Sequence, residues 1–317
     1  MKIIKYTFFI LMMAAFVGAC SGIRYADKQP LLFAEIDYGF ETHFLPGDPG
    51  IAYIDEGSGE QTILLVHGLA SNAGFWRYNI AELAKDYRVI AIDLPGYGKS
   101  DKGDYSYGMS FYATQIADFI EEMELENVIY VGHSMGGQIG ITLSINHPET
   151  VDKLILAAPA GIEKFDPGEG EWLGNALNMR GIRTATEPQV RANLSINFYR
   201  WDEEFEWMVE ERVRMAKDQP EMKEFAYTVL ASINAMLDEP TTDLLPEINH
   251  QTLIIYGKQD GMIPNRYLNP GHTNKVFEKG AEAIPNATLI ELDKTGHMLQ
   301  IESPAAFNQA ILNYLEK

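Results

Sequence analysis

The pentapeptide Gly-His-Ser-Met-Gly at residues 132–136 is the segment of this sequence with the clearest capacity for chemistry. It follows an apolar, β-branched run at 127–131 and precedes a segment of helical periodicity. A glycine on each side of the serine lets the backbone fold back tightly, so that the hydroxyl projects from the end of a strand. The N-terminus of the following helix then faces the reacting group. The pattern therefore predicts a nucleophilic serine, Ser134.

The elements that must position this serine are short apolar runs that alternate with longer segments of helical period. Six runs are nearly continuous in apolar residues, as expected of strands buried on both faces: 62–66, 88–92, 127–131, 153–157, 252–256 and 288–292. Four helices are expected between or after them: 76–85, 111–123, 135–145 and 305–315. Two earlier runs, 41–44 and 52–55, are expected to pair as an antiparallel opening. This alternation predicts an α/β fold with a mostly parallel central sheet flanked by helices.

The alternation stops between residues 162 and 245, where aromatic and methionine side chains occur among many charges and the pattern is helical throughout. Strands and helices alternate again from Gln251, which favours an insertion over a separate domain. We therefore expect a core of residues 36–161 and 246–317 with a helical cap at 162–245. Aromatic residues at helical spacing usually pack in a core, and some of these could also line an apolar pocket.

From about Tyr53 to the C-terminus the chain resembles the α/β-hydrolase family, in its serine-triad, esterase- and lipase-like branch with a helical cap. In that family the triad acid follows a late strand. Residues 256–264, Tyr-Gly-Lys-Gln-Asp-Gly-Met-Ile-Pro, match the acid segment and give the acid as Asp260. The histidine comes last, and Thr-Gly-His at 295–297 gives it as His297. The chain order of serine, aspartate and histidine agrees with that fold.

The resemblance implies a catalytic triad of Ser134, Asp260 and His297. A serine hydroxyl is a poor nucleophile near neutral pH, so His297 would take its proton. Asp260 would accept the other ring N–H, fix the tautomer and stabilise the cation that forms. The family meets the negative charge of the substrate oxygen with two backbone N–H groups. Here they belong to Met135, after the nucleophile, and to Leu69, after the His-Gly pair.

Each triad residue also has an interpretation without chemistry. Ser134 could be an ordinary helix N-cap, and Asp260 a turn residue beside glycine. His297 could occupy a core position. Asp152 and Asp243 are the alternative acids, because some members of the family take the acid from after another strand.

Composition and motifs argue against several other classes of protein. The 25 basic residues are outnumbered by 45 acidic ones, giving a formal charge of −20 that would repel phosphate backbones. Nucleic acid is therefore not an expected partner. Residues 93–100 end in Gly-Lys-Ser but lack the glycine spacing of a phosphate loop or a dinucleotide fingerprint. No metal-ligand cluster is apparent in the sequence, and we expect neither a metal nor a cofactor.

The first twenty residues have the features of an export signal. Lys2 and Lys5 precede an apolar run at 6–17 that is too short to span a bilayer comfortably. Val-Gly-Ala-Cys at 17–20 resembles the bacterial lipobox, in which the cysteine is lipidated and becomes the first residue of the mature protein. Cys20 is the only cysteine of the chain, so it cannot form an internal disulfide.

The N-terminus thus predicts a lipoprotein signal peptide at 1–19, a lipidated Cys20 and a tether at 20–35. The protein would be exported to the bacterial cell envelope and would contact a membrane only through this lipid anchor. Secretion in soluble form, after cleavage behind Ala19, is the alternative.

These observations lead to an expected function, hydrolysis of a small apolar carboxylic ester through an acyl-enzyme on Ser134. Relatives that dehalogenate or open epoxides use aspartate at that position, which makes those activities unexpected here. C–C bond hydrolases keep a serine triad, but the glycine- and proline-rich continuation of their His-Gly loop is absent from residues 69–73. They are the second hypothesis. A non-catalytic, surface-tethered binding protein with the same fold is the third.

Overall fold

The computed structural model describes residues 23–316 with the exception of residue 177. The predicted signal peptide at 1–19 and Cys20 lie outside the described residues. Within the described part of the chain, no helix combines the length and the apolar character that crossing a membrane requires.

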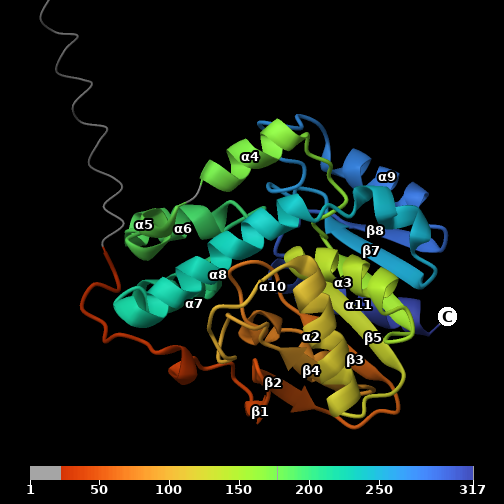
Figure 1. Cartoon of the computed structure of the whole chain (residues 1–317), viewed down its shortest axis with the longest axis horizontal. Helices are drawn as coiled ribbons and strands as arrows, with labels where there is room; N and C mark the ends of the chain where they lie inside the picture. The colour runs from red at the N-terminus through yellow and green to blue at the C-terminus, as the bar shows by residue number, and fades with distance from the viewer. Residues whose placement is uncertain (1–22, 177, 317) are drawn as a thin grey trace, which may run out of the picture.

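An eight-stranded sheet forms the centre of the molecule (Figure 1). Its strands are β1 (His43–Leu45), β2 (Ile51–Glu56), β3 (Thr62–Val66), β4 (Arg88–Ile92), β5 (Val128–His133), β6 (Lys153–Ala157), β7 (Gln251–Gly257) and β8 (Ala287–Leu292). Their spatial order is β1-β2-β4-β3-β5-β6-β7-β8. The pairs β1–β2 and β2–β4 are antiparallel, and the other pairs are parallel. The predicted α/β class, with an antiparallel opening and a mostly parallel sheet, is confirmed.

Helices cover both faces of this sheet because its central strands are apolar on both sides. The covering helices are α1 (Ile80–Leu83), α2 (Met109–Glu122), α3 (Met135–Asn146), α9 (Thr273–Ala283), α10 (Leu299–Glu302) and α11 (Pro304–Leu315), with a 3₁₀ turn η2 (Ala73–Trp76). Helix α2 packs against α3 on one face, whereas α11 packs with α1 against the other (Figure 1). The strands β3 to β7 therefore lie in a core that is almost closed to solvent.

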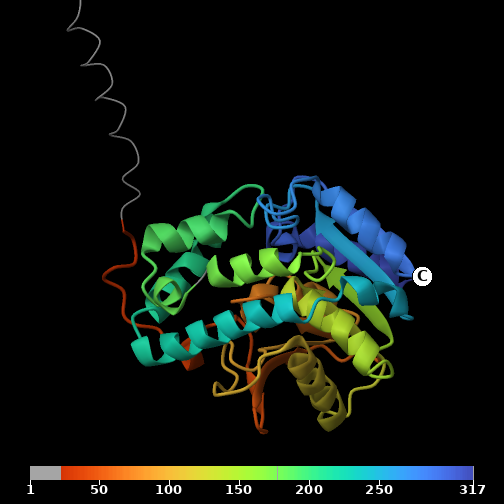
Figure 2. The ribbon, with the colours of Figure 1, turned by 45° about the horizontal axis from the view of Figure 1, so that its top comes forward.

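The segment between β6 and β7 is helical, and its helices group together at one side of the sheet (Figures 1 and 2). They are α4 (Pro167–Ala176), α5 (Met179–Arg183), α6 (Glu187–Ser195), α7 (Glu206–Met215) and α8 (Gln219–Asp238), with 3₁₀ turns η3 (Glu203–Phe205) and η4 (Thr242–Glu247). We call this insertion the cap. Phe198, Phe205 and Met208 form an apolar cluster there with Phe75 of the core, so the cap is packed onto the core through side chains.

The sequence predicts a tether at residues 20–35. In the structure, part of this segment is bound to the folded domain. The amide of Tyr25 donates to the Glu187 carboxylate at 3.0 Å, and the amide of Phe33 donates to Glu221 at 2.7 Å. Both acceptors belong to the cap. We refer to residues 24–35 as the arm, because this segment lies along the cap helices (Figure 1).

Candidate active site

Ser134 stands at a sharp turn between β5 and α3. Its φ of 53° and ψ of −114° are unusual for an L-residue and persist only where surrounding contacts fix the backbone. The Ser134 amide donates to the Ala157 carbonyl at 3.0 Å, and its carbonyl accepts from Gly137 at 2.8 Å and from Ala160 at 3.0 Å. The residue occupies the N-cap position of α3, yet its side chain makes no capping hydrogen bond. The hydroxyl is therefore not used as a helix cap.

The glycines around Ser134 are required by close backbone packing. A Cβ at Gly136 would lie 2.5 Å from the Val66 carbonyl oxygen, and a Cβ at Gly132 would overlap the Gly136 carbonyl. A Cβ at Gly68 would lie 3.1 Å from Cβ of Ser134. The turn that follows β3 thus lies directly against the predicted nucleophile.

The second and third predicted residues, Asp260 and His297, are joined by a hydrogen bond. Nδ1 of His297 lies 2.8 Å from Oδ2 of Asp260, and both side chains are almost completely buried. The other carboxylate oxygen, Oδ1, accepts the amides of Met262 at 2.7 Å and Ile263 at 3.0 Å. Since a carboxylate only accepts, the shared proton belongs to Nδ1 of His297. Nε2 is then the ring nitrogen that can act as a general base.

The loop that carries His297 also contacts the residue before the serine. The rings of His133 and His297 are 4.9 Å apart between centroids, and Nε2 of His133 donates to the His297 carbonyl at 3.0 Å. Burial, followed by the proximity of His297, lowers the pKa of His133 well below its ordinary value. His133 is therefore an uncharged bridge between the two loops. Nothing in the sequence pattern around residues 132–136 indicates this contact with the loop of His297.

The two alternative acids do not join this group. Asp152 immediately precedes β6, whereas Ser134 follows β5, so the parallel arrangement places them at opposite ends of the sheet. Asp243 is exposed and pairs with Lys164 at 2.8 Å. Asp260 is the acid that the fold brings to His297.

The two predicted oxyanion donors flank the serine turn. Met135 is the first residue of α3, and the first amides of a helix have no acceptor within the helix. Leu69 lies in a turn closed by a hydrogen bond of 3.3 Å from the Ser71 amide to the Gly68 carbonyl. Leu69 directly follows Gly68, which packs against Ser134, so both predicted donors belong to segments adjacent to the serine turn.

His67 fixes the orientation of the Leu69 amide. Its Nδ1 donates to the Gly68 carbonyl at 2.8 Å, while its Nε2 accepts from the Leu94 amide at 3.1 Å. In a trans peptide the N–H points away from the C=O of the same unit. The Leu69 N–H therefore points away from the His67 ring. Burial lowers the pKa of His67, which keeps this ring neutral and able to accept from Leu94.

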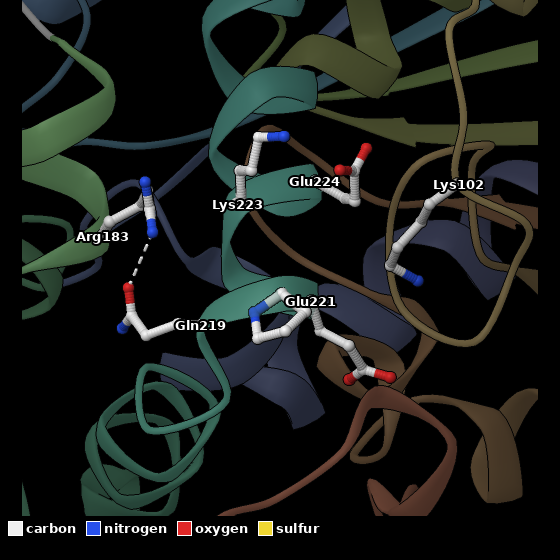
Figure 3. A pocket seen from close by; sticks show the side chains of 7 residues that line it. Lys102, Arg183, Gln219, Glu221, Lys223 and Glu224 are labelled. Atoms are coloured by element: carbon white, nitrogen blue, oxygen red, sulfur yellow. Dashed lines mark hydrogen bonds between the residues drawn. The ribbon is translucent and has the colours of Figure 1, made fainter.

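Two surface cavities lie elsewhere. A cavity of about 660 Å³ is lined by charged side chains that include Lys102 and Glu221, and Arg183 donates there to Gln219 at 3.0 Å (Figure 3). A second, of about 440 Å³, lies between α4 and the C-terminal half of α8. No triad residue lines either cavity, so both are separate from the candidate active site.

Comparisons with known proteins agree with this fold. The model of the α/β-hydrolase fold family matches residues 61–304. A relative from Pseudomonas putida, 2-hydroxy-6-oxononadienedioate/2-hydroxy-6-oxononatrienedioate hydrolase 1, is 29% identical over 278 residues, which cover 84% of this chain and 92% of the relative.

Two solved structures extend the likeness to three dimensions. A probable hydrolytic enzyme from Pseudomonas aeruginosa PAO1 has a TM-score of 0.80 and 26% identity, covering 90% of this chain and 98% of its own. An esterase from Exiguobacterium antarcticum has a TM-score of 0.73 and 26% identity, covering 87% and 100%. With a family match that spans most of its length, the chain belongs to the α/β-hydrolase fold family.

Proposed function

We propose that this protein is a serine hydrolase that cleaves carboxylic esters through an acyl-enzyme on Ser134. The proposal is carried by the buried hydrogen bond of 2.8 Å between His297 and Asp260. The loop of His297 contacts His133, the residue before a serine whose backbone is fixed in an unusual conformation. A carboxylate that holds the proton on Nδ1 leaves Nε2 as the ring nitrogen that can take the proton of the serine hydroxyl.

The chemistry would proceed in two half-reactions. The Ser134 hydroxyl attacks the ester carbonyl while Nε2 of His297 takes its proton, and the carbonyl oxygen becomes negative between the amides of Leu69 and Met135. The C–O bond to the alcohol then breaks, and His297 returns the proton to the leaving oxygen. Water deprotonated by His297 attacks the acyl-enzyme and releases the acid, restoring the Ser134 hydroxyl.

Cleavage of a C–C bond beside a ketone is the second candidate. Its support is the likeness to the Pseudomonas putida dienedioate hydrolase. The likeness to the Exiguobacterium esterase supports the ester instead. The sequence Leu-Ala-Ser-Asn-Ala at 69–73, without glycine or proline, also favours the ester.

A fluorophosphonate probe and a substrate panel test the proposal. We expect the full chain to be labelled on Ser134 and to hydrolyse nitrophenyl esters within the series from acetyl to palmitoyl. Ser134→Ala should lose labelling and lower turnover by roughly a million-fold, as in other triad enzymes. Faster turnover of a dienoate ketone than of any ester would favour the C–C hydrolase. Absence of labelling in the folded wild type would favour a non-catalytic binding protein.

We also propose that Cys20 is lipidated and that the protein is held at the cell envelope. The support is the lipobox-like sequence at 17–20, which follows two lysines and an apolar run. Metabolic labelling with palmitate should mark the wild type and not Cys20→Ala, and the variant should leave the membrane fraction. An unlabelled wild type in the medium would indicate soluble secretion.

A further inference from the structure

A partly buried arginine of the cap, Arg212, contacts the turn that carries Leu69. Arg212, on α7, donates from Nη2 to the Ala70 carbonyl at 2.5 Å, although the two residues are 142 positions apart in the chain. Its guanidinium carbon lies 4.5 Å from the centroid of the Phe225 ring. The arginine is thus held between the turn on one side and an aromatic face of α8 on the other.

The carbonyl that Arg212 contacts belongs to a strained residue. Ala70 has a φ of 57°, a conformation that an L-residue adopts at a cost of about 1–2 kcal/mol. Such backbone persists where surrounding contacts determine it. In this turn, Gly68 O is held by His67 and Ser71, and Ala70 O is held by Arg212. The Gly68–Leu69 and Ala70–Ser71 peptide units are therefore each held by a side-chain donor, His67 for the first and Arg212 for the second.

Glu211, the residue before Arg212 in α7, binds Asn72, which follows the same turn. Nδ2 of Asn72 donates to Oε1 of Glu211 at 2.9 Å. Oδ1 of Asn72 accepts from the Gly74 amide at 3.0 Å, which ties this contact to the start of η2. Two consecutive residues of α7 thus bind this segment. Arg212 donates to the Ala70 carbonyl, and Glu211 accepts from the side-chain amide of Asn72.

We propose that Arg212 is a positioning residue, which holds Ala70 so that the Leu69 amide points at the oxyanion of the substrate. The inference rests on the proposed function, since it concerns the same oxyanion site. The hydrogen bond from Arg212 ends on the Ala70 carbonyl and not on a reacting atom, so Arg212 acts through the backbone of the turn. The cap would then contribute to catalysis indirectly, by holding the turn of the core that supplies the Leu69 amide.

Loss of this contact should affect the transition state more than the bound substrate. The oxyanion carries full charge only after attack, so a misaligned Leu69 amide lowers kcat and leaves KM nearly unchanged. Removal of one oxyanion donor costs about 10²–10³ in kcat, and misalignment should cost part of that. We expect kcat to fall about 10- to 100-fold in Arg212→Met, with a smaller fall in Arg212→Lys, which retains the charge.

A matched control lies two residues away. Arg214, on the same helix, also donates to a backbone carbonyl, that of Gln29 in the arm, at 3.0 Å. Arg214→Met removes an arginine and a cap contact without touching the turn. It should therefore retain wild-type kcat within about threefold, which separates positioning of the turn from a general loosening of the cap.

The experiment measures kcat and KM for a nitrophenyl ester, fluorophosphonate labelling and affinity for a trifluoromethyl ketone that forms an oxyanion on the serine. The expected result is a fully labelled Arg212→Met with lower kcat, weaker ketone affinity and unchanged KM. If this variant does not fold, Arg212→Lys carries the same test. Wild-type kcat in a folded Arg212 variant, an equal loss in Arg214→Met, or a change in KM alone would overturn the inference. An unlabelled wild type would instead overturn the proposed function on which it rests.

Discussion

Oδ2 of Asp260 lies 2.8 Å from Nδ1 of His297, while the other oxygen of the same carboxylate accepts two backbone amides. The carboxylate is therefore fixed by its own turn before it meets the imidazole. Because Oδ1 is held by the two amides, only Oδ2 is available to orient the His297 ring.

Replacing this carboxylate by an amide tests the orientation. In Asp260→Asn the side-chain NH₂ can face Nδ1, which favours the tautomer with the proton on Nε2 and removes the base. By analogy with the same change in another triad enzyme, kcat should fall about 10⁴-fold. Asp243→Asn is the control, because Asp243 pairs with Lys164 on the surface. Loss of ester hydrolysis in Asp243→Asn rather than in Asp260→Asn would reassign the acid.

The glycine at 136 should be irreplaceable for stability as well as for activity. In Gly136→Ala the new methyl group would meet the carbonyl oxygens of Val66 and His67 at 2.5 and 2.8 Å. Backbone atoms cannot move aside as a flexible side chain does, so the free energy of unfolding should fall by about 1–3 kcal/mol or more. Urea unfolding measures this. Gly168→Ala in α4 has nothing within 4 Å of its Cβ and should be neutral or stabilising. Equal effects of the two changes would contradict the packing at the serine turn.

The sequence predicts the sheet better than the helices, for a physical reason. β3, β4 and β6 have the predicted bounds, because strands buried on both faces are continuous apolar runs. The predicted helix at 76–85 is instead a 3₁₀ turn, η2, followed by the single-turn α1. Helix α9 was not predicted, although its apolar residues recur at helical spacing, with Phe277 buried and Val276 and Ala281 packed against the core.

The triad pattern is local in sequence, whereas the contacts that surround it are not. Ser134 and His297 each stand in a short motif beside a predicted strand. By contrast, the carbonyl of Ala70 is an ordinary backbone group, and nothing near it in sequence indicates that Arg212 binds it. The arm is similar, because Tyr25 and Glu187 are 162 positions apart. Contacts of this kind follow from the fold and not from a pattern.

The arm should contribute to stability without contributing to turnover. The Tyr25 hydroxyl donates to Oε2 of Glu206 at 3.0 Å, and Tyr25 is only 8% exposed. Because a hydrogen bond to a charged group contributes about 1.5–3 kcal/mol, Tyr25→Phe should lower the free energy of unfolding by that order and leave kcat unchanged. Tyr199→Phe, half exposed, should change it by less than about 0.5 kcal/mol. An unaffected Tyr25→Phe would show that the arm is not docked in solution.

Acidification should destabilise the protein through His133. Burial lowers its pKa in the folded state below the ordinary value of about 6.5 that it regains on unfolding. Below pH 6.5 the unfolded chain therefore binds a proton that the folded chain does not, and stability falls as pH falls. One such histidine contributes up to about 1.4 kcal/mol per pH unit.

Urea unfolding of the wild type and His133→Gln between pH 7.5 and 5.5 isolates this contribution, because carboxylates and His67 act in both proteins. The wild type should lose stability more steeply with falling pH, by up to about 1.4 kcal/mol per unit. At pH 7.5 both states of His133 are largely neutral, so a difference in stability there reports the hydrogen bond to the His297 carbonyl. Parallel pH profiles would mean that His133 is protonated in the folded state.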